Sequence, residues 1–382
     1  MPNRVRGGRY PGAEILQRIE RVSPPRRGTC ALPFTFFEAA IAGYQQMRAC
    51  AVRAGFLASL GLSACSSVQS ALAPEGDTAR AILQLFWFFT AVCAAVWLIV
   101  MVLMVVAVAR RRVAVPDPVL EPDPVQERRI GWIIGGGIAA TIAIFVVFTI
   151  ASFLTNKSFA EPRPHGLIVK VTGHQWWWQV DYEAHEPDQT FQTANEIHIP
   201  VGQPVKLDFE SPDVIHSFWV PNLAGKQDLI PGRYTSLTIE ADKPGVYRGQ
   251  CAEYCGIQHA HMAMYVVAQT ASDFSQWRAQ QLKPARAPNN ADLRHGQQVF
   301  QSSACAMCHT IAGTNAGGQV GPDLTHFGSR MTIAAGTARN SLGNLSGWIA
   351  DPQRMKPYTR MPPVALTGPD LLAVSHYLES LK

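Results

Sequence analysis

Two long uncharged apolar stretches constrain this chain more than any other feature of its sequence. Ala81–Ala109 and Ile130–Asn156 contain no Asp, Glu, Lys or Arg and are rich in large apolar side chains. Each exceeds the roughly 20 residues that a helix needs to cross the hydrocarbon core of a bilayer. A buried helix of a large soluble protein is the alternative, but such helices are rarely this long and this free of charge. The sequence therefore predicts two transmembrane helices.

Arginines near the segment that connects these stretches predict the orientation of the helices. The arginines are Arg110, Arg111, Arg112, Arg128 and Arg129. Arginine in short loops stays on the cytoplasmic side, so the helices should form a hairpin with both flanks outside. The chain is then a multi-pass protein of the bacterial plasma membrane, with everything after Lys157 on the extracytoplasmic side.

The first 64 residues are predicted to be a leader rather than part of a domain. Basic residues near Met47 precede an apolar stretch that ends in Leu62-Ser63-Ala64-Cys65. This pattern is typical of a secretory signal that ends in the lipobox of bacterial lipoproteins. Residues 1–64 are therefore interpreted as the signal segment, 65–157 as the hairpin region and Cys65 as the lipidation site. An ordinary leader with an unrelated cysteine is the alternative, and Met47 is an alternative start of translation.

The segment 158–270 has the pattern of an all-β domain. Short segments rich in β-branched and aromatic residues are separated by Gly, Pro and Asp, which predicts a β-sandwich or barrel. These segments are Leu167–Val171, Glu196–Ile199, Val205–Phe209, Thr235–Ile239 and Met264–Ala268.

Two segments of this β domain carry side chains that bind soft metals. The segment Cys251–Met262 offers two thiols, imidazoles and a thioether within twelve residues. The segment Asp213–Phe218 adds the imidazole of His216. Sulfur combined with imidazole suits copper, and an axial thioether is typical of electron-transfer copper. Two cysteines in place of one predict two metal ions bridged by two thiolates. A zinc site is the alternative by ligand type. It would use Cys251, Cys255, His259 and His261, and it leaves Met262 and His216 without a role.

The spacing of this segment resembles that of subunit II of cytochrome c oxidase. The matching residues are Cys251, Glu253, Cys255, His259 and Met262. The resemblance implies a cupredoxin-like sandwich with a binuclear copper centre, CuA, in which both cysteines bridge both coppers. It also implies that His216 and His259 are terminal ligands, and that Met262 and the Glu253 carbonyl are weak axial ligands. The Glu253 side chain would face a magnesium site at the boundary with subunit I.

The segment Gly173–Trp178 is similar to an aromatic segment of the same family. In that segment the first tryptophan passes electrons to copper, and this role would fall to Trp176. Aromatic clusters more often serve core packing, so the electron-input role rests on the resemblance. The chain departs from the family at Arg129, where a glutamate linked to a proton pathway is usual, and at Gly136, which replaces a usual proline. The resemblance therefore assigns no residue of this chain to proton uptake.

The C-terminal part carries a c-type haem attachment sequence, Cys305-Ala306-Met307-Cys308-His309. The two thiols would bind the haem vinyl groups, and His309 would bind the iron. Met361, followed by proline, is the expected second axial ligand, with Met355 as the alternative. A thioether opposite histidine raises the reduction potential of the haem. Residues 271–290 are interpreted as a linker and 291–382 as an all-α, class I-like cytochrome c domain.

The order of these parts resembles the caa-type oxidases, in which a cytochrome c domain is fused to subunit II. The implied function is electron input to a respiratory haem–copper terminal oxidase. Electrons would pass from cytochrome c through haem c and CuA to subunit I, where oxygen is reduced to water and protons are pumped. Subunits I and III and an external cytochrome c are the implied partners. The net charge of +5 is too modest to indicate nucleic-acid binding.

Two other functions fit parts of the pattern. A nitric oxide reductase subunit with the same copper centre is one, and a non-enzymatic, membrane-tethered electron carrier is the other. A free carrier needs only one anchor, so the two-helix hairpin argues against the carrier. A quinol oxidase subunit would resemble this domain without its copper ligands.

Overall fold

The structure is a computed structural model that describes residues 68–110, 124–160, 166–184 and 186–382. Cys65, Arg111 and Arg112 lie outside these residues, so the expectations about the lipidation site and about part of the arginine-rich loop stay predictions.

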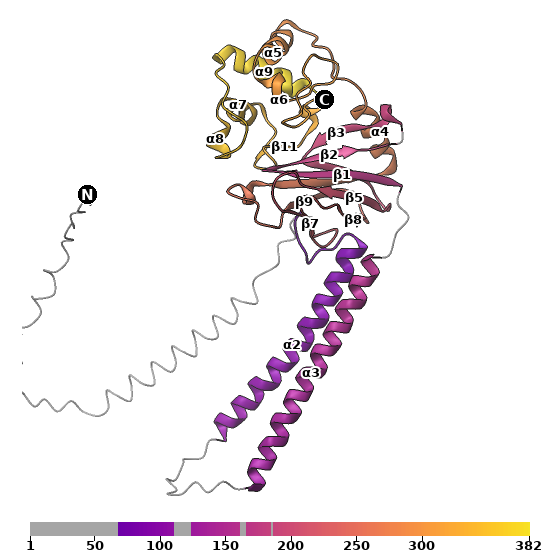
Figure 1. The fold of residues 1–382 in the computed structure, drawn as a ribbon, viewed down its shortest axis with the longest axis vertical. Coiled ribbons are helices and arrows are strands. Elements are labelled where there is room, and N and C mark those ends of the chain that lie inside the picture. The colour runs from indigo at the N-terminus through magenta and orange to yellow at the C-terminus, as the bar shows by residue number, and fades with distance from the viewer. Residues whose placement is uncertain (1–67, 111–123, 161–165, 185) are drawn as a thin grey trace, which may run out of the picture. The chain divides into compact units, whose positions relative to one another are not determined.

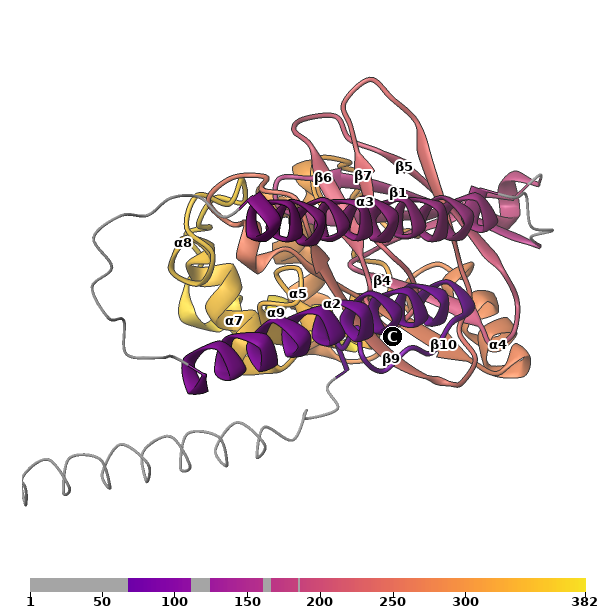
Figure 2. The same cartoon turned by 90° about the horizontal axis from the view of Figure 1, so that it is seen from below.

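Two helices, α2 (Asp77–Ala109) and α3 (Pro124–Ala160), contain the apolar stretches. Both are long and apolar enough to cross a membrane, and they run side by side in opposite directions (Figures 1 and 2). Phe89 stacks on Phe148 with ring centroids 4.2 Å apart. Most large side chains on both helices are exposed in the isolated chain, as expected for surfaces that face lipid. Each helix extends beyond its apolar stretch.

The β domain is a sandwich of two five-stranded sheets. One sheet has the order β3-β2-β1-β5-β8 and the other β4-β10-β9-β6-β7. The β1–β5 and β4–β10 pairs are parallel, and the other paired strands are antiparallel. The first sheet consists of β1 (Leu167–His174), β2 (Trp177–Tyr182), β3 (Phe191–Ala194), β5 (Val205–Glu210) and β8 (Thr235–Ile239). The second consists of β4 (Glu196–Pro200), β6 (His216–Trp219), β7 (Gln227–Leu229), β9 (Gly245–Cys251) and β10 (Ala263–Gln269).

The core of the sandwich lies between the two sheets. Buried and partly exposed residues alternate along β2 and β5, because successive side chains of a strand point to opposite faces. Trp178, Phe209 and Phe218 are among the largest fully buried side chains. The strands β6 and β9 pair at Phe218 and Cys251, so the sequence-distant segments that carry His216 and Cys251 meet on neighbouring strands.

The first half of the predicted linker is helical. Helix α4 (Ala271–Gln281) begins after Thr270, whose hydroxyl accepts a hydrogen bond from the Asp273 amide. Trp277 of this helix stacks on His198 of β4, with ring centroids 4.0 Å apart. The helix therefore packs on the sandwich, and the extended part of the connection is the proline-containing stretch that follows it.

The C-terminal domain is helical, with one short hairpin, β11 (Thr332–Ile333) and β12 (Ala338–Arg339). Its helices are α5 (Ala291–Ser302), α6 (Cys305–Cys308), α7 (Leu342–Ala350), α8 (Pro352–Met355) and α9 (Gly368–Ser380). The first and last helices cross at Gly296, where an added Cβ would lie 2.1 Å from the Ala373 carbonyl oxygen. Phe300, Val374 and Tyr377 are buried in the core that this crossing creates. The predicted fold class is confirmed in each part, whereas the domain boundaries stay a prediction.

Candidate metal and haem sites

Two buried thiols form the centre of the first site. Cys251 ends β9 and Cys255 lies in the loop that follows, and both are free cysteines. Their sulfur atoms are 3.8 Å apart, which is too far for a disulfide but close enough for two thiols to share metal ions. His216 Nδ1 lies 3.9 Å from the Cys251 sulfur, and His259 Nδ1 lies 3.7 Å from the Cys255 sulfur.

The two thiols and two imidazoles, together with two weaker donors from Met262 and Glu253, form a group that we call the thiol site. The Met262 sulfur is 3.8 Å from the Cys255 sulfur, and the Glu253 carbonyl oxygen is 3.2 Å from the Cys251 sulfur. In contrast, His261 Nδ1 contacts the Gln258 side chain at 2.8 Å. The structure thus brings together every residue that was predicted to bind copper, and its donor set of thiols, imidazoles and a thioether fits that metal.

Electrostatics favour deprotonation at the thiol site. The hydrogen bond between the two sulfurs, with further contacts from His216 and backbone groups, lowers the pKa of Cys251 well below that of a free thiol. The same hydrogen bond raises the pKa of Cys255, because the second thiol would ionise beside a thiolate. The pair therefore carries one negative charge readily, and a bound cation would favour ionisation of the second thiol.

Asp213 supports His216 from the side that faces away from the sulfurs. Its Oδ1 lies 2.9 Å from His216 Nε2, and its carboxylate also accepts hydrogen bonds from the amides of Val214 and Gln175. Burial opposes ionisation, but these hydrogen bonds lower the pKa of Asp213 to about 2. An ionised Asp213 accepts a hydrogen bond from His216 Nε2–H and leaves Nδ1 free to bind a metal beside Cys251, as outer carboxylates do in metal sites.

The three tryptophans of Trp176–Trp178 have different environments. Trp176 is buried, and its indole nitrogen donates to the Cys255 carbonyl at 2.9 Å, directly beside the thiol site. Trp177 stacks on His174, with ring centroids 4.6 Å apart. Trp178 belongs to the sandwich core and contacts His216 edge-on. Only Trp176 thus hydrogen-bonds to the backbone of a predicted ligand.

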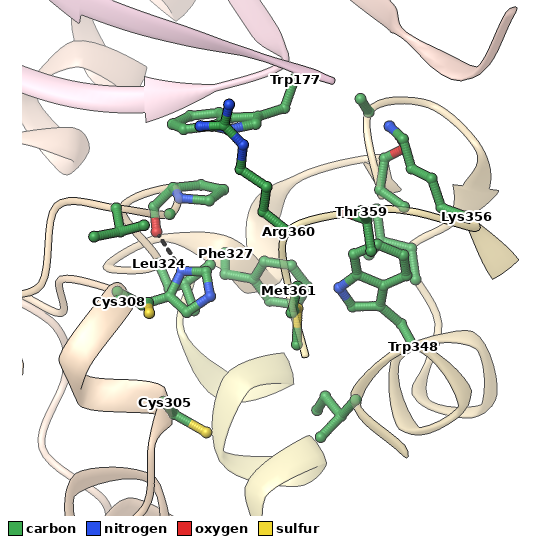
Figure 3. A pocket seen from close by; sticks show the side chains of 18 of the residues that line it. Trp177, Cys305, Cys308, Leu324, Phe327, Trp348, Lys356, Thr359, Arg360 and Met361 are labelled. Carbon is green, nitrogen blue, oxygen red and sulfur yellow. Dashed lines mark hydrogen bonds between the residues drawn. The ribbon is translucent and has the colours of Figure 1, made fainter. Parts of the chain in front are cut away.

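The second site is a cavity of about 260 Å³ that is mostly lined by apolar side chains. Cys305, Cys308, His309 and Met361 all line it, and Figure 3 shows Met361 beside Phe327 and Trp348. Met355, the alternative axial ligand, packs instead against the hydrophobic core of the helical domain. The sandwich closes one side of the cavity with Trp176 and Trp177, so this site lies between the two domains.

The position of His309 suits an axial ligand. Its Nδ1 lies 2.8 Å from the Pro322 carbonyl, so this nitrogen carries the proton and Nε2 is left to bind iron. Burial lowers the pKa of His309, which keeps the ring neutral. Gly321 makes room for the ring, because a Cβ there would lie 2.6 Å from His309 Cε1. An apolar cavity with two thiols and a neutral imidazole fits a covalently attached haem.

Three further residues near these sites were not predicted. Asp213 could have been noticed from the sequence, because it stands three residues before His216 in the same segment. Lys356 and Arg360 come from the helical domain, and no local pattern marks them. Figure 3 shows Arg360 extending toward Trp177, and its guanidinium lies 3.8 Å from the Asp213 carboxylate.

Comparisons with known proteins match the two domains that carry these sites. Residues 167–270 match the family described as cytochrome c oxidase subunit II, periplasmic domain, and residues 293–382 match cytochrome c. Cytochrome c oxidase subunit 2 of Alkalihalophilus pseudofirmus is 37% identical over 248 residues, which cover 63% of this chain and 70% of that protein. The protein of the same name from Bacillus subtilis is 27% identical over 262 residues, 63% of this chain and 72% of the relative.

A solved structure also resembles part of the chain. It is the periplasmic domain of subunit II of cytochrome oxidase from Bradyrhizobium japonicum, with 29% identity and a TM-score of 0.29. The match covers 31% of this chain and 95% of that one.

Proposed function

Since this chain belongs to the cytochrome c oxidase subunit II family and ends in a cytochrome c domain, we propose that it transfers electrons from cytochrome c to the catalytic subunit through a haem and a dicopper centre. As an oxidase subunit with two candidate membrane helices, it is a membrane protein with periplasmic domains. The observation that carries the proposal is the pair of buried, unbridged thiols with one imidazole beside each.

The residues of this chain would hold both groups. Cys251 and Cys255 would bridge two coppers, with His216, His259, Met262 and the Glu253 carbonyl as the remaining ligands. Cys305 and Cys308 would bind the haem covalently, with His309 and Met361 on the iron. When bound, the haem and the copper pair would supply the one-electron chemistry for transfer between cytochrome c and subunit I.

Trp176 would provide the contact between the two centres. It lines the haem cavity and donates a hydrogen bond to the Cys255 carbonyl, so one side chain touches both sites. This position supports the electron-input role that the resemblance implies for Trp176.

The proposal extends to the rest of the oxidase. Oxygen reduction and proton pumping would take place in subunit I, with subunit III as a further partner. The Glu253 side chain would face a magnesium ion at the boundary with subunit I, while Arg129 occupies the position where the family usually has a glutamate linked to proton uptake. Residues 1–64 would be the leader, with the hairpin, sandwich and haem domains in the order that the sequence predicts.

Metal and haem stoichiometry of the purified full-length chain tests the proposal. We expect two coppers per chain, an electron paramagnetic resonance signal from one electron shared between them, and one covalent haem. A single copper, or zinc at Cys251 and Cys255, would refute the dicopper centre. Lack of covalent haem in cells that mature c-type cytochromes would refute the haem assignment.

Replacing Asp213 with Ala should weaken copper binding without removing a ligand. Loss of an outer carboxylate that orients a ligating histidine typically lowers metal affinity by about 10- to 100-fold. Competition with a copper chelator measures the change. Asp208→Ala is the matched control, because Asp208 pairs with Lys206 on β5 and does not contact the thiol site. Equal affinities for both variants would mean that Asp213 does not orient His216.

Replacing Cys65 with Ser should abolish lipid labelling of the chain. The cysteine thiol is the acceptor of the diacylglyceryl group in bacterial lipoproteins, and the serine hydroxyl is not. Metabolic labelling with a fatty acid measures the change, with Cys93→Ser as the control. Undiminished labelling of the Cys65→Ser chain would contradict the lipobox interpretation.

A further inference from the structure

Lys356 lies at the contact between the helical domain and the sandwich. It directly follows α8, and only 2% of its surface is exposed. Its Nζ reaches into the sandwich and donates to the carbonyls of Trp176 at 2.6 Å and His261 at 2.7 Å. A third hydrogen bond, at 3.2 Å, goes to the Ala334 carbonyl of its own domain.

The surroundings of this amine are unusual for a lysine. In the part of the chain that the structure describes, no carboxylate lies within ion-pair distance of Nζ, and burial lowers the pKa of Lys356 to about 7. The ammonium form has three N–H donors, one for each carbonyl, whereas the neutral amine has two. Hydrogen bonds from a charged donor are the stronger kind, and they offset the unfavourable desolvation of the ammonium group.

Other polar contacts cross the same boundary. The Ala263 amide donates to the Ala335 carbonyl at 2.9 Å, and the Met331 amide donates to the Glu196 carboxylate at 2.6 Å. Lys356 differs from them in that it also contacts the backbone of Trp176. One of its acceptors belongs to Trp176, and another belongs to His261, the neighbour of Met262. It thus joins the helical domain to Trp176, which donates a hydrogen bond to the Cys255 carbonyl, and to the residue that precedes Met262.

We propose that Lys356 is a positioning residue that fixes the haem cavity against Trp176 by bridging the helical domain to the Trp176 and His261 carbonyls. Figure 3 shows Lys356 beside the cavity, on the segment that continues through Thr359 and Arg360 to Met361. The same segment therefore carries the interdomain contact and the expected axial methionine. The inference rests on the proposed function, because positioning matters only if electrons cross this boundary.

The test compares Lys356→Met with Lys283→Met in the full-length chain assembled in its oxidase. Methionine keeps the length and the apolar stem of lysine but donates no hydrogen bond. Lys283 is an exposed lysine of the connecting segment, and its amine donates to the Gln280 side chain, so it is the matched control.

The first readout is hydrogen exchange at the Ala263 and Met331 amides, because each donates to an acceptor in the other domain. Loss of hydrogen bonds from a charged donor should speed exchange at both amides by about tenfold or more in Lys356→Met. The control should exchange like the unmodified chain. Unchanged exchange at both amides would overturn the proposal.

The second readout is the rate of haem-to-copper electron transfer after flash reduction of the haem. We expect a decrease of up to about 100-fold, the size of effect that a misplacement of about 1 Å can cause. The slowed rate should depend on solvent viscosity, which a docked pair does not show. An unchanged rate with both centres loaded would overturn the proposal, even if exchange is faster.

The two readouts distinguish failure of the proposed function from failure of the positioning role of Lys356. If the unmodified chain lacks dicopper or haem, the proposed function fails, while the exchange comparison still tests docking. If Lys356→Met does not accumulate, Lys356→Gln keeps an uncharged donor and allows the same comparison. Loss of both centres from both variants would overturn the proposal, because Lys356 would then be needed for folding.

Discussion

Replacement of Cys251 by Ser should abolish the dicopper signal and lower oxidase activity with cytochrome c by at least about 100-fold. A serine hydroxyl is a hard ligand with a far higher pKa than a thiol, so it does not bridge two coppers as a thiolate does. The Cys251 sulfur also contacts His216, Cys255 and the Glu253 carbonyl, so its removal affects most of the donor set. Copper content, electron paramagnetic resonance and oxygen uptake measure the effect.

Cys93→Ser is the control for this substitution. Cys93 is an exposed free cysteine in α2, far in sequence from the thiol site, and its replacement should leave copper content and activity unchanged. Covalent haem should persist in Cys251→Ser, because Cys305 and Cys308 belong to the other domain. Full dicopper content in Cys251→Ser would show that this thiol does not bridge the metals.

Replacement of Gly296 by Ala should destabilise the haem domain more than a Gly→Ala change at any other glycine of its α-helices. The added Cβ would lie 2.1 Å from the Ala373 carbonyl oxygen and 2.8 Å from Tyr377 Cβ, so α5 and α9 would have to separate. Overpacking of this kind typically costs about 1–3 kcal/mol, occasionally more. Thermal unfolding followed by the haem absorbance measures the loss.

Gly347→Ala separates overpacking from the effect of alanine itself. Gly347 lies in α7 of the same domain, and an added Cβ there meets nothing within 4 Å. Alanine in a helix interior is favoured over glycine by about 1 kcal/mol, so this variant should be at least as stable as the unmodified chain. Equal stability of both variants would mean that the helices do not cross tightly at Gly296.

The parts of the fold that local sequence determines could be predicted. The apolar stretches predict membrane helices by their length and lack of charge. The two thiols of each motif lie within four residues of one another, so each pair is visible in the local sequence. The helix α4 also had a local signal in Thr270-Ala271-Ser272-Asp273, which is a capping pattern. The proline and alanine content of 271–290 obscured it, so the helix in the first half of this segment was not predicted.

Features that depend on contacts between residues distant in the sequence could not be predicted from local sequence. Gly296 gives no sign that Ala373 will lie against it, because the crossing of α5 and α9 is set by the packing of the whole domain. Lys356 has the appearance of an ordinary surface lysine. Its burial depends on the docking of two domains whose contacting residues are up to 180 positions apart. His216 was placed at the thiol site by family resemblance, and the pairing of β6 with β9 gives the physical reason.

The segment just before α2 has a mechanical consequence for the sandwich. Val68 and Glu75 accept hydrogen bonds from the Arg248 and Asp242 amides, and Arg80 in the first turns of α2 pairs with the Asp242 carboxylate at 2.7 Å. A domain on one loose tether would sample many heights and tilts above a bilayer. Here the start of the first candidate membrane helix is held to the sandwich by backbone hydrogen bonds and an ion pair, so this helix, once in a bilayer, would restrict the distance and tilt of the thiol site relative to the lipid.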